Sequence, residues 1–251
     1  MITLADAITN AFVTLTKLSI PLYVDINGKP ALVGSGFFVS KGTSNLLVSA
    51  AHVLDQAKKS LLYYYIETGT KRHVTGKLVT NTHSGLRETD KLDLGAVLLD
   101  GSHQPPYPQV EKFALPEAML NRRSIPSATS RYGFVGFPAS RSRIRNRPAQ
   151  VIVQPYAHVG SLASLTQYQA ERLDPSTHLC LNFNKKKSYD LLGNGRSFPK
   201  PHGISGSPIF HLFDEGDPEQ AESFLLAGVV TTWLPSSNLV FGAGIRAVIE
   251  L

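Results

Sequence analysis

The chain has 251 residues, of which 42% are hydrophobic and 18% charged, a balance typical of a folded globular protein and not of a disordered one. Its 25 lysines and arginines exceed its 19 aspartates and glutamates and give a net charge of +6, which predicts a moderately basic surface. The single cysteine, Cys180, excludes an intrachain disulfide and favours a reducing compartment.

The N-terminal region predicts a helix and not a leader peptide. Residues 1–11 contain Asp6 and lack both a basic start and a long apolar run. Leu4 to Leu18 predicts a short amphipathic helix that runs into a strand. No stretch approaches 18 uninterrupted apolar residues, so no membrane segment is expected. Together with the lone cysteine, these features predict a cytoplasmic protein.

Beyond this helix, short apolar runs are bounded by Gly, Pro, Asn, Asp or Ser, which is typical of all-β barrels and sandwiches. Residues 101–127 and 185–202 are long connections without such runs, and residues 245–251 predict the start of a final helix. The twelve predicted strands are 20–24, 31–40, 45–49, 61–67, 75–79, 94–99, 131–137, 150–156, 179–183, 208–212, 225–232 and 239–245.

Three segments carry residues that suit a nucleophilic site. An apolar strand ends in Ser49-Ala50-Ala51-His52, so that strand delivers a histidine at its end. Asp93 precedes the apolar strand at 94–99, whereas its rival Asp90 has the alternative interpretation of a turn or capping residue. Ser205 lies in the tight segment Gly203-Ile204-Ser205-Gly206-Ser207-Pro208.

These residue types are the ones that acyl transfer requires. A serine hydroxyl is a weak nucleophile and needs an adjacent base, which near neutral pH is most often histidine. A carboxylate fixes the tautomer of that histidine and stabilises its imidazolium. We therefore predict His52, Asp93 and Ser205 as a catalytic triad, and the backbone N–H groups of Gly203 and Ser205 as an oxyanion hole.

The order His, Asp, Ser, with the contexts Ser-Ala-Ala-His, Asp-Leu-Gly-Ala-Val-Leu and Gly-Ile-Ser-Gly-Ser-Pro, resembles the trypsin-like (chymotrypsin-fold) serine peptidases of the disulfide-poor bacterial type. Residues 131–138, 226–233 and 241–245 resemble later strands of the same family. The resemblance implies an all-β fold of two six-stranded antiparallel β-barrels with short N- and C-terminal helices. It places one peptidase domain on residues 1–251, with the barrels at roughly 1–110 and 128–251.

The resemblance also implies a function, which is that of a serine endopeptidase acting through an acyl-enzyme at Ser205. It implies neither a cofactor nor a metal, and its expected partner is a protein substrate. A regulatory protein partner is a further hypothesis, with the loop at 185–202 as a candidate gate. The residues that the resemblance places near the substrate are His202, Thr231, Thr232, Trp233 and Gly242.

Two departures from the family pattern bear on activation and specificity. Ile204 stands where activatable members carry an aspartate that pairs with a freed N-terminus, so activation by that route is not expected. Pro199 stands at the position that forms the base of the primary specificity pocket in the family, and the acid nearest to it in that loop, Asp190, lies fifteen residues before Ser205. The sequence therefore gives no support for a preference for Lys or Arg.

Two other functions remain open. One is a non-catalytic protein-binding module on the same fold, against which the complete His, Asp and Ser set argues. The other is nucleic-acid binding through Arg141, Arg143, Arg145 and Arg147, which alternate and would share one face of an extended segment. No aromatic residues are interleaved with these arginines, so this alternative is not favoured. Cys180 lies in an apolar run, which indicates that its thiol is buried in the core and inert.

Overall fold

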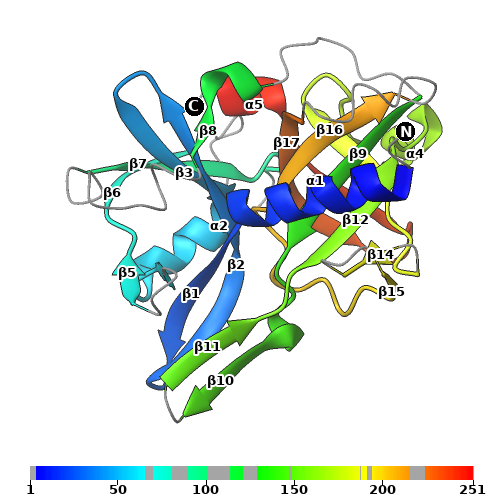
Figure 1. The fold of residues 1–251 in the computed structure, drawn as a ribbon. Coiled ribbons are helices and arrows are strands. Elements are labelled where there is room, and N and C mark those ends of the chain that lie inside the picture. Colours follow the sequence, from blue (N-terminus) through cyan, green and yellow to red (C-terminus); the bar gives the residue numbers. More distant parts are fainter. Residues whose placement is uncertain are drawn as a thin grey trace.

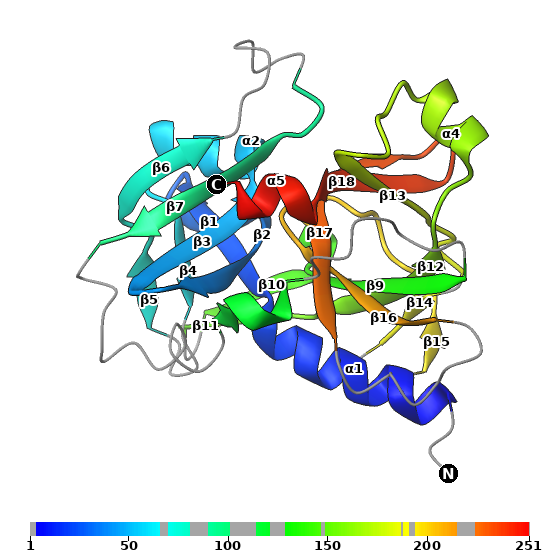
Figure 2. The ribbon, with the colours of Figure 1, turned by 90° about the horizontal axis from the view of Figure 1, so that it is seen from above.

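The structure is a computed structural model in which two β-barrels stand side by side (Figures 1 and 2). The residues that it describes are 4–65, 70–80, 90–100, 114–120, 129–146, 149–186, 188–190, 194–214 and 224–250.

The first barrel is formed by the sheet β5-β4-β1-β2-β3-β7-β6, with β8 paired to β2. Its pairs are antiparallel apart from β2 and β8, which run parallel. The strands are β1 (Ile20–Ile26), β2 (Lys29–Lys41), β3 (Ser44–Ala50), β4 (Tyr63–Tyr65), β5 (Lys71–His73), β6 (Gly76–Thr80), β7 (Leu94–Leu99) and β8 (Leu115–Pro116).

The second barrel is formed by the sheet β13-β18-β17-β16-β9-β12-β14-β15, and a bridge between Leu162 and Leu181 connects the end of β12 to β13. Its strands are β9 (Ser130–Gly136), β12 (Tyr156–Ser161), β13 (His178–Asn182), β14 (Ser188–Tyr189), β15 (Gly195–Arg196), β16 (Pro208–Asp214), β17 (Leu225–Leu234) and β18 (Leu239–Gly244). A separate hairpin of β10 (Ser142–Asn146) and β11 (Ala149–Val153) projects toward the first barrel (Figure 1).

Helices cover the barrels and their junction. In Figure 2, α1 runs along the second barrel and α5 lies between the two barrels. None of the helices in the described part of the chain is long and apolar enough to cross a membrane. The helical segments are α1 (Leu4–Leu18), α2 (Ala51–Leu54), α4 (Leu165–Ala170) and α5 (Ile245–Ile249), with short 3₁₀ turns at Asp55–Lys58, Glu117–Met119 and Ala139–Arg141.

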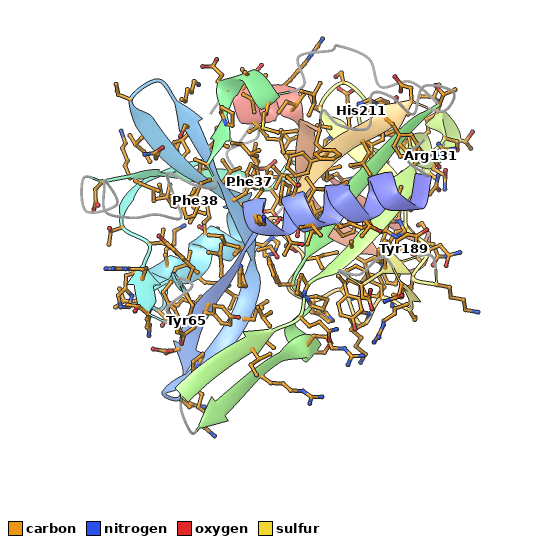
Figure 3. All side chains as sticks on the ribbon, viewed as in Figure 1. Phe37, Phe38, Tyr65, Arg131, Tyr189 and His211 are labelled. Carbon is orange, nitrogen blue, oxygen red and sulfur yellow. The ribbon has the colours of Figure 1, made fainter. Side chains whose placement is uncertain are left out.

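Adjacent residues of β2 serve two different cores, because successive side chains of a strand point to opposite faces. Phe38 packs inside the first barrel, where its ring meets Tyr64 edge-on at 5.5 Å. Phe37 joins an apolar cluster that also contains Phe12 of α1 and Val135 of β9, so this cluster connects the barrels. In Figure 3, Phe37 is nearer to the second barrel than Phe38 is.

The predicted all-β double barrel with terminal helices is confirmed. In the described part of the chain, each sheet contains two short strands in addition to the predicted six. These are β5, β8, β14 and β15, which pair through their backbones and have no apolar run that would have predicted them. The predicted strand at 150–156 is divided into β11 and β12 around Pro155, which has no N–H to donate.

Other differences are local. The sequence pattern missed β10, α2 and α4, although Ser164 and Gln167 form a capping box at the start of α4. Of the predicted strand at 61–67, the structure describes β4, whereas residues 66 and 67 lie outside the described part. Of the predicted connection at 101–127, only 114–120 is described, and it holds β8 and a 3₁₀ turn.

Candidate active site

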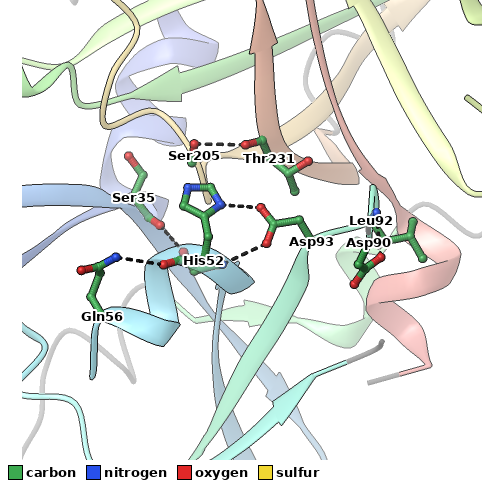
Figure 4. Close-up of polar contacts among 9 residues, drawn as sticks. Ser35, His52, Gln56, Asp90, Leu92, Asp93, Ser205 and Thr231 are labelled. Carbon is green, nitrogen blue, oxygen red and sulfur yellow. Dashed lines mark hydrogen bonds and ion pairs between the residues drawn. The ribbon is translucent and has the colours of Figure 1, made fainter. Parts of the chain in front are cut away.

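The pairing of β3 with β7 brings His52 to Asp93. The register sets Ala50 opposite Leu94, so the chain leaving β3 meets the residue that precedes β7. Ala51 N donates to the carbonyl oxygen of Asp93 at 2.6 Å, and His52 N donates to Asp93 Oδ1 at 2.9 Å. The second carboxylate oxygen, Oδ2, contacts Nδ1 of the His52 ring (Figure 4). Asp93 therefore holds both the backbone and the imidazole of His52.

The Asp93 backbone adopts an unusual conformation to do this. Its φ is 45°, in the left-handed region that aspartate tolerates better than most residues. Its side chain is mostly buried at 18% exposed, whereas the His52 side chain is 50% exposed. The carboxylate is thus held beside the Nδ1 edge of the ring, and half of the His52 side chain remains exposed to solvent. The rival residue Asp90 accepts a hydrogen bond from Leu92 N at 3.0 Å. Asp90 therefore has the role of a turn residue, which was its alternative interpretation in the sequence.

Ser205 lies in a turn of the second barrel that packs against β2 of the first. Ser35 N donates to the carbonyl oxygen of Ser205 at 2.7 Å, and Ser35 Oγ donates to the carbonyl oxygen of Gly203 at 2.8 Å. Gly206 has a φ of +90°, and a Cβ there would lie 1.9 Å from Ser35 O. This close approach requires glycine at 206.

Ser35 is the residue that sequence reasoning missed at this site. The available signal was the Gly34-Ser35-Gly36 pattern inside a strand, because glycine within a strand often marks a close approach of another backbone. Ser49 Oγ donates to Ser35 O at 2.6 Å, so a second buried serine supports the first.

The Ser205 hydroxyl points toward β17 in this structure. Its Oγ donates to the carbonyl oxygen of Thr231 at 3.1 Å and not to the His52 ring. Figure 4 shows the imidazole with Asp93 on one side and Ser205 above it in that view. The structure therefore places the three predicted residues in one region, but Ser205 does not form a hydrogen bond with His52.

The backbone at Gly203 presents an unpaired donor. Ile204 N donates to Pro201 O at 3.1 Å and Gly203 has a φ of +99°, which together describe a type II turn. His202 O accepts from Ala139 N at 2.7 Å, and in a planar trans peptide the Gly203 N–H must point the opposite way. Neither this N–H nor that of Ser205 donates to another described residue. Both are free to bind an oxyanion.

Apolar packing supports the Ser205 turn at Ile204, the position at which activatable members of the trypsin-like family use an ion pair. Ile204 is 1% exposed and belongs to the core of the second barrel. A Cβ on Gly203 would lie 2.6 Å from Phe137 O and 2.5 Å from Leu32 Cδ2, so glycine is also required there. The buried Ile204 side chain thus supports the turn from the core of the second barrel.

The predicted substrate-contacting residues lie on three elements around Ser205. His202 is exposed on the turn itself, and Thr232 and Trp233 are half-buried near the end of β17. Thr231 is buried and provides the carbonyl that Ser205 contacts. Gly242 is buried within the ladder of β17 and β18, opposite Val230. Their roles toward a substrate stay predictions.

Burial makes the single cysteine of the chain unreactive. Burial raises the pKa of the Cys180 thiol to about 12, so this cysteine stays protonated and is a poor nucleophile. Among the described residues no group of three or more His, Cys, Asp and Glu side chains could hold a metal ion.

Three solved structures resemble this chain over most of its length. A thermostable serine protease, AL20, from an extremophilic microorganism matches with a TM-score of 0.57 at 14% identity, covering 94% of this chain and 95% of that one. A Glu endopeptidase in complex with MPD matches with a TM-score of 0.50 at 13% identity, covering 93% and 87%. The serine endoprotease from Yersinia pestis matches with a TM-score of 0.51 at 14% identity, covering 95% and 64%.

The chain has the chymotrypsin-like fold of bacterial serine proteases. No family model matches the sequence, and no curated protein matches it. At this level of identity the chymotrypsin-like fold is shared and the activity does not follow from it.

Proposed function

We propose that this protein is a serine endopeptidase that hydrolyses peptide bonds through an acyl-enzyme at Ser205. The observation that carries the proposal is the contact of the Asp93 carboxylate with both the N–H and the ring of His52, beside a serine turn with free N–H groups. This set supplies a nucleophile, a base, an orienting carboxylate and two oxyanion donors.

The reaction begins with a rotation of the Ser205 side chain. Its hydroxyl leaves Thr231 O and donates to the free ring nitrogen of His52, which requires a change between staggered rotamers. His52 accepts the proton as Ser205 Oγ bonds to the substrate carbonyl carbon. The Gly203 and Ser205 N–H groups bind the negative oxygen that forms.

The tetrahedral intermediate then collapses to the acyl-enzyme. The C–N bond breaks and His52 gives its proton to the leaving amine, while Asp93 stays ionised and stabilises the imidazolium. A water molecule then bonds to the acyl carbon as it gives a proton to His52. The bond between that carbon and Ser205 Oγ breaks, His52 returns the proton to Oγ, and the acid is released. The substrate of this proposal is a protein, and no metal or cofactor takes part.

Location and regulation belong to the same proposal. The single cysteine supports a cytoplasmic location. A protease in that compartment needs restriction, and the loop at 185–202, which includes β14 and β15, is the segment we assign to control by a protein partner.

A fluorophosphonate probe, which reacts with an activated serine, tests the proposal. We expect wild-type protein to be labelled, and we expect Ser205→Ala and His52→Ala to show no labelling. Ser207→Ala is the matched control, because its buried hydroxyl has no partner among the described residues and its removal leaves the turn intact. Absence of labelling both in purified protein and in lysate of the native source would refute the peptidase.

The bond between Ser205 and Thr231 favours a second candidate, which is a protein-binding module on the same fold. In that case the serine would never engage His52 and no variant would be labelled. The nucleic-acid hypothesis stays a hypothesis: Arg141 and Arg143 are exposed, whereas Arg147 and the side chain of Arg145 lie outside the described part.

A further inference from the structure

The Lys185 ammonium group packs on the Trp233 ring, near the end of β17, the strand that contacts Ser205. Lys185 Nζ lies 4.2 Å from the centroid of the Trp233 ring. Trp233 follows Thr231 by two residues on β17, and Thr231 O accepts the Ser205 hydrogen bond. Two residues of a strand advance about 7 Å. The Lys185 charge therefore lies within reach of a side chain of a peptide bound at Ser205.

No carboxylate in the described part of the chain neutralises Lys185. In its own loop, Asp190 is bound by Arg196 Nε at 2.8 Å and by Asn194 N at 3.0 Å. At the site itself, the Asp93 carboxylate faces His52. The Trp233 ring attracts the ammonium through its quadrupole. The ammonium has three N–H donors, and the ring face can satisfy only some of them. The ammonium is thus held in place while it can still bind an anion.

A second cation contacts the apolar cluster against which Trp233 packs. Phe198 of this cluster donates its N–H to Lys185 O at 2.8 Å. Its ring packs against Tyr156 at 5.5 Å, and the Arg141 guanidinium lies 5.8 Å from the Tyr156 ring. Both aromatic residues are buried, and Arg141 is exposed. Lys185 on Trp233 and Arg141 on Tyr156 therefore both contact rings of this cluster, and their two positive charges attract an acidic peptide segment.

We propose that Lys185 selects substrates with a carboxylate side chain on the acyl side of the scissile bond, within three residues of the carbonyl that Ser205 attacks. The proposal rests on the proposed peptidase function and names its substrate class. The carboxylate binds the Lys185 ammonium, and the methylene groups of the same substrate side chain pack on Trp233. An amide of the same shape keeps the packing and loses the charge-assisted bond.

Tripeptidyl diphenyl phosphonates test this, because they react covalently at the serine and report recognition without turnover. Compounds are paired so that one position carries Glu in one and Gln in the other, for each of the three positions in turn. We expect wild-type protein to react about tenfold faster with the Glu compound at one of these positions. In Lys185→Gln that ratio falls to about one. Lys186→Gln, its exposed neighbour, keeps the wild-type ratio.

A second measurement needs no variant. If the Glu preference is electrostatic, the ratio measured for wild-type protein shrinks as the salt concentration rises. Equal rates for both members of every pair, including no reaction with either, would overturn the proposal, and so would a Glu preference that persists in Lys185→Gln or is independent of salt. Failure of the peptidase function itself is seen separately, as absence of labelling of wild-type protein by the simple fluorophosphonate.

Discussion

Ser35 of the first barrel connects that barrel to the Ser205 turn of the second barrel through hydrogen bonds of its side chain and its backbone. Its hydroxyl donates to Gly203 O at 2.8 Å and is 3.4 Å from the Phe137 N–H, and its own N–H donates to Ser205 O. Gly203 and Ser205 are the two residues whose N–H groups we assign to the oxyanion hole. The conformation of the Ser205 turn therefore depends on a residue of the first barrel.

Replacement of Ser35 by alanine measures this dependence. Ser35→Ala leaves the Gly203 carbonyl without its donor, at a cost of about 1 kcal/mol. If that cost falls on the aligned state of the turn, fluorophosphonate labelling slows about fivefold. Ser40→Ala is the control, because its hydroxyl donates to Asn45 Oδ1 in the neighbouring strand, at the far end of β2. Equal labelling rates for the two variants would show that Ser35 has no part in aligning the turn.

At the level of elements, Lys91 connects the turn before β7 to the end of α4. Its Nζ donates to Glu171 O at 2.7 Å and lies 3.3 Å from Arg172 O. The last carbonyls of a helix attract a cation because they have no partner within the helix. Lys91 precedes Asp93 by two residues, so this contact across the barrels restrains the left-handed backbone of Asp93.

Lys91→Met is expected to slow labelling of Ser205 several-fold, because Asp93 then holds His52 less firmly. Lys91→Arg is expected to restore most of the rate, since its guanidinium can also donate to the α4 carbonyls. Lys77→Met removes an exposed lysine of β6 and serves as the control for loss of charge. A Lys91→Met protein that is labelled at the wild-type rate would contradict a positioning role.

For the whole molecule, the cluster between the barrels determines how the two halves are joined. Phe12 and Leu15 of α1 are fully buried in it, together with Phe37 of β2 and Phe210 of β16. Phe12 also meets Tyr189 with ring centroids 6.0 Å apart, and Figure 3 shows Tyr189 beside α1. The N-terminal helix is thus part of the folded unit and not an appendage.

Phe12→Ala therefore destabilises the protein by about 3–5 kcal/mol, as expected for a large buried ring whose loss leaves a cavity. Val13 on the same helix is 45% exposed, and Val13→Ala is expected to change the free energy of unfolding by less than about 0.5 kcal/mol. Urea unfolding followed by tryptophan fluorescence measures both values. A small effect of Phe12→Ala would mean that α1 does not contribute to the stability of the joined barrels.

Much of this architecture was predictable from local pattern. Strands β1, β2, β3, β7, β16 and β17 and the helix α1 were predicted near their observed bounds, because each buries an apolar run of its own. The preference for Asp93 over Asp90 had the same local ground, because an apolar run begins directly after Asp93. These features depend on residues close together in the chain, and local periodicity reports them.

The short strands were not predictable in this way, because they lack an apolar run of their own. Neither were the contacts of Ser35 and Lys91 or the packing of Lys185 on Trp233. Each of these three contacts joins segments that are far apart in sequence, as when Ser35 meets Gly203 or Lys91 meets Glu171. A serine or a lysine has the same local pattern whether it faces water or another barrel. Only the packing of the two barrels fixes which backbone group it meets, because that choice depends on the fold of the entire chain.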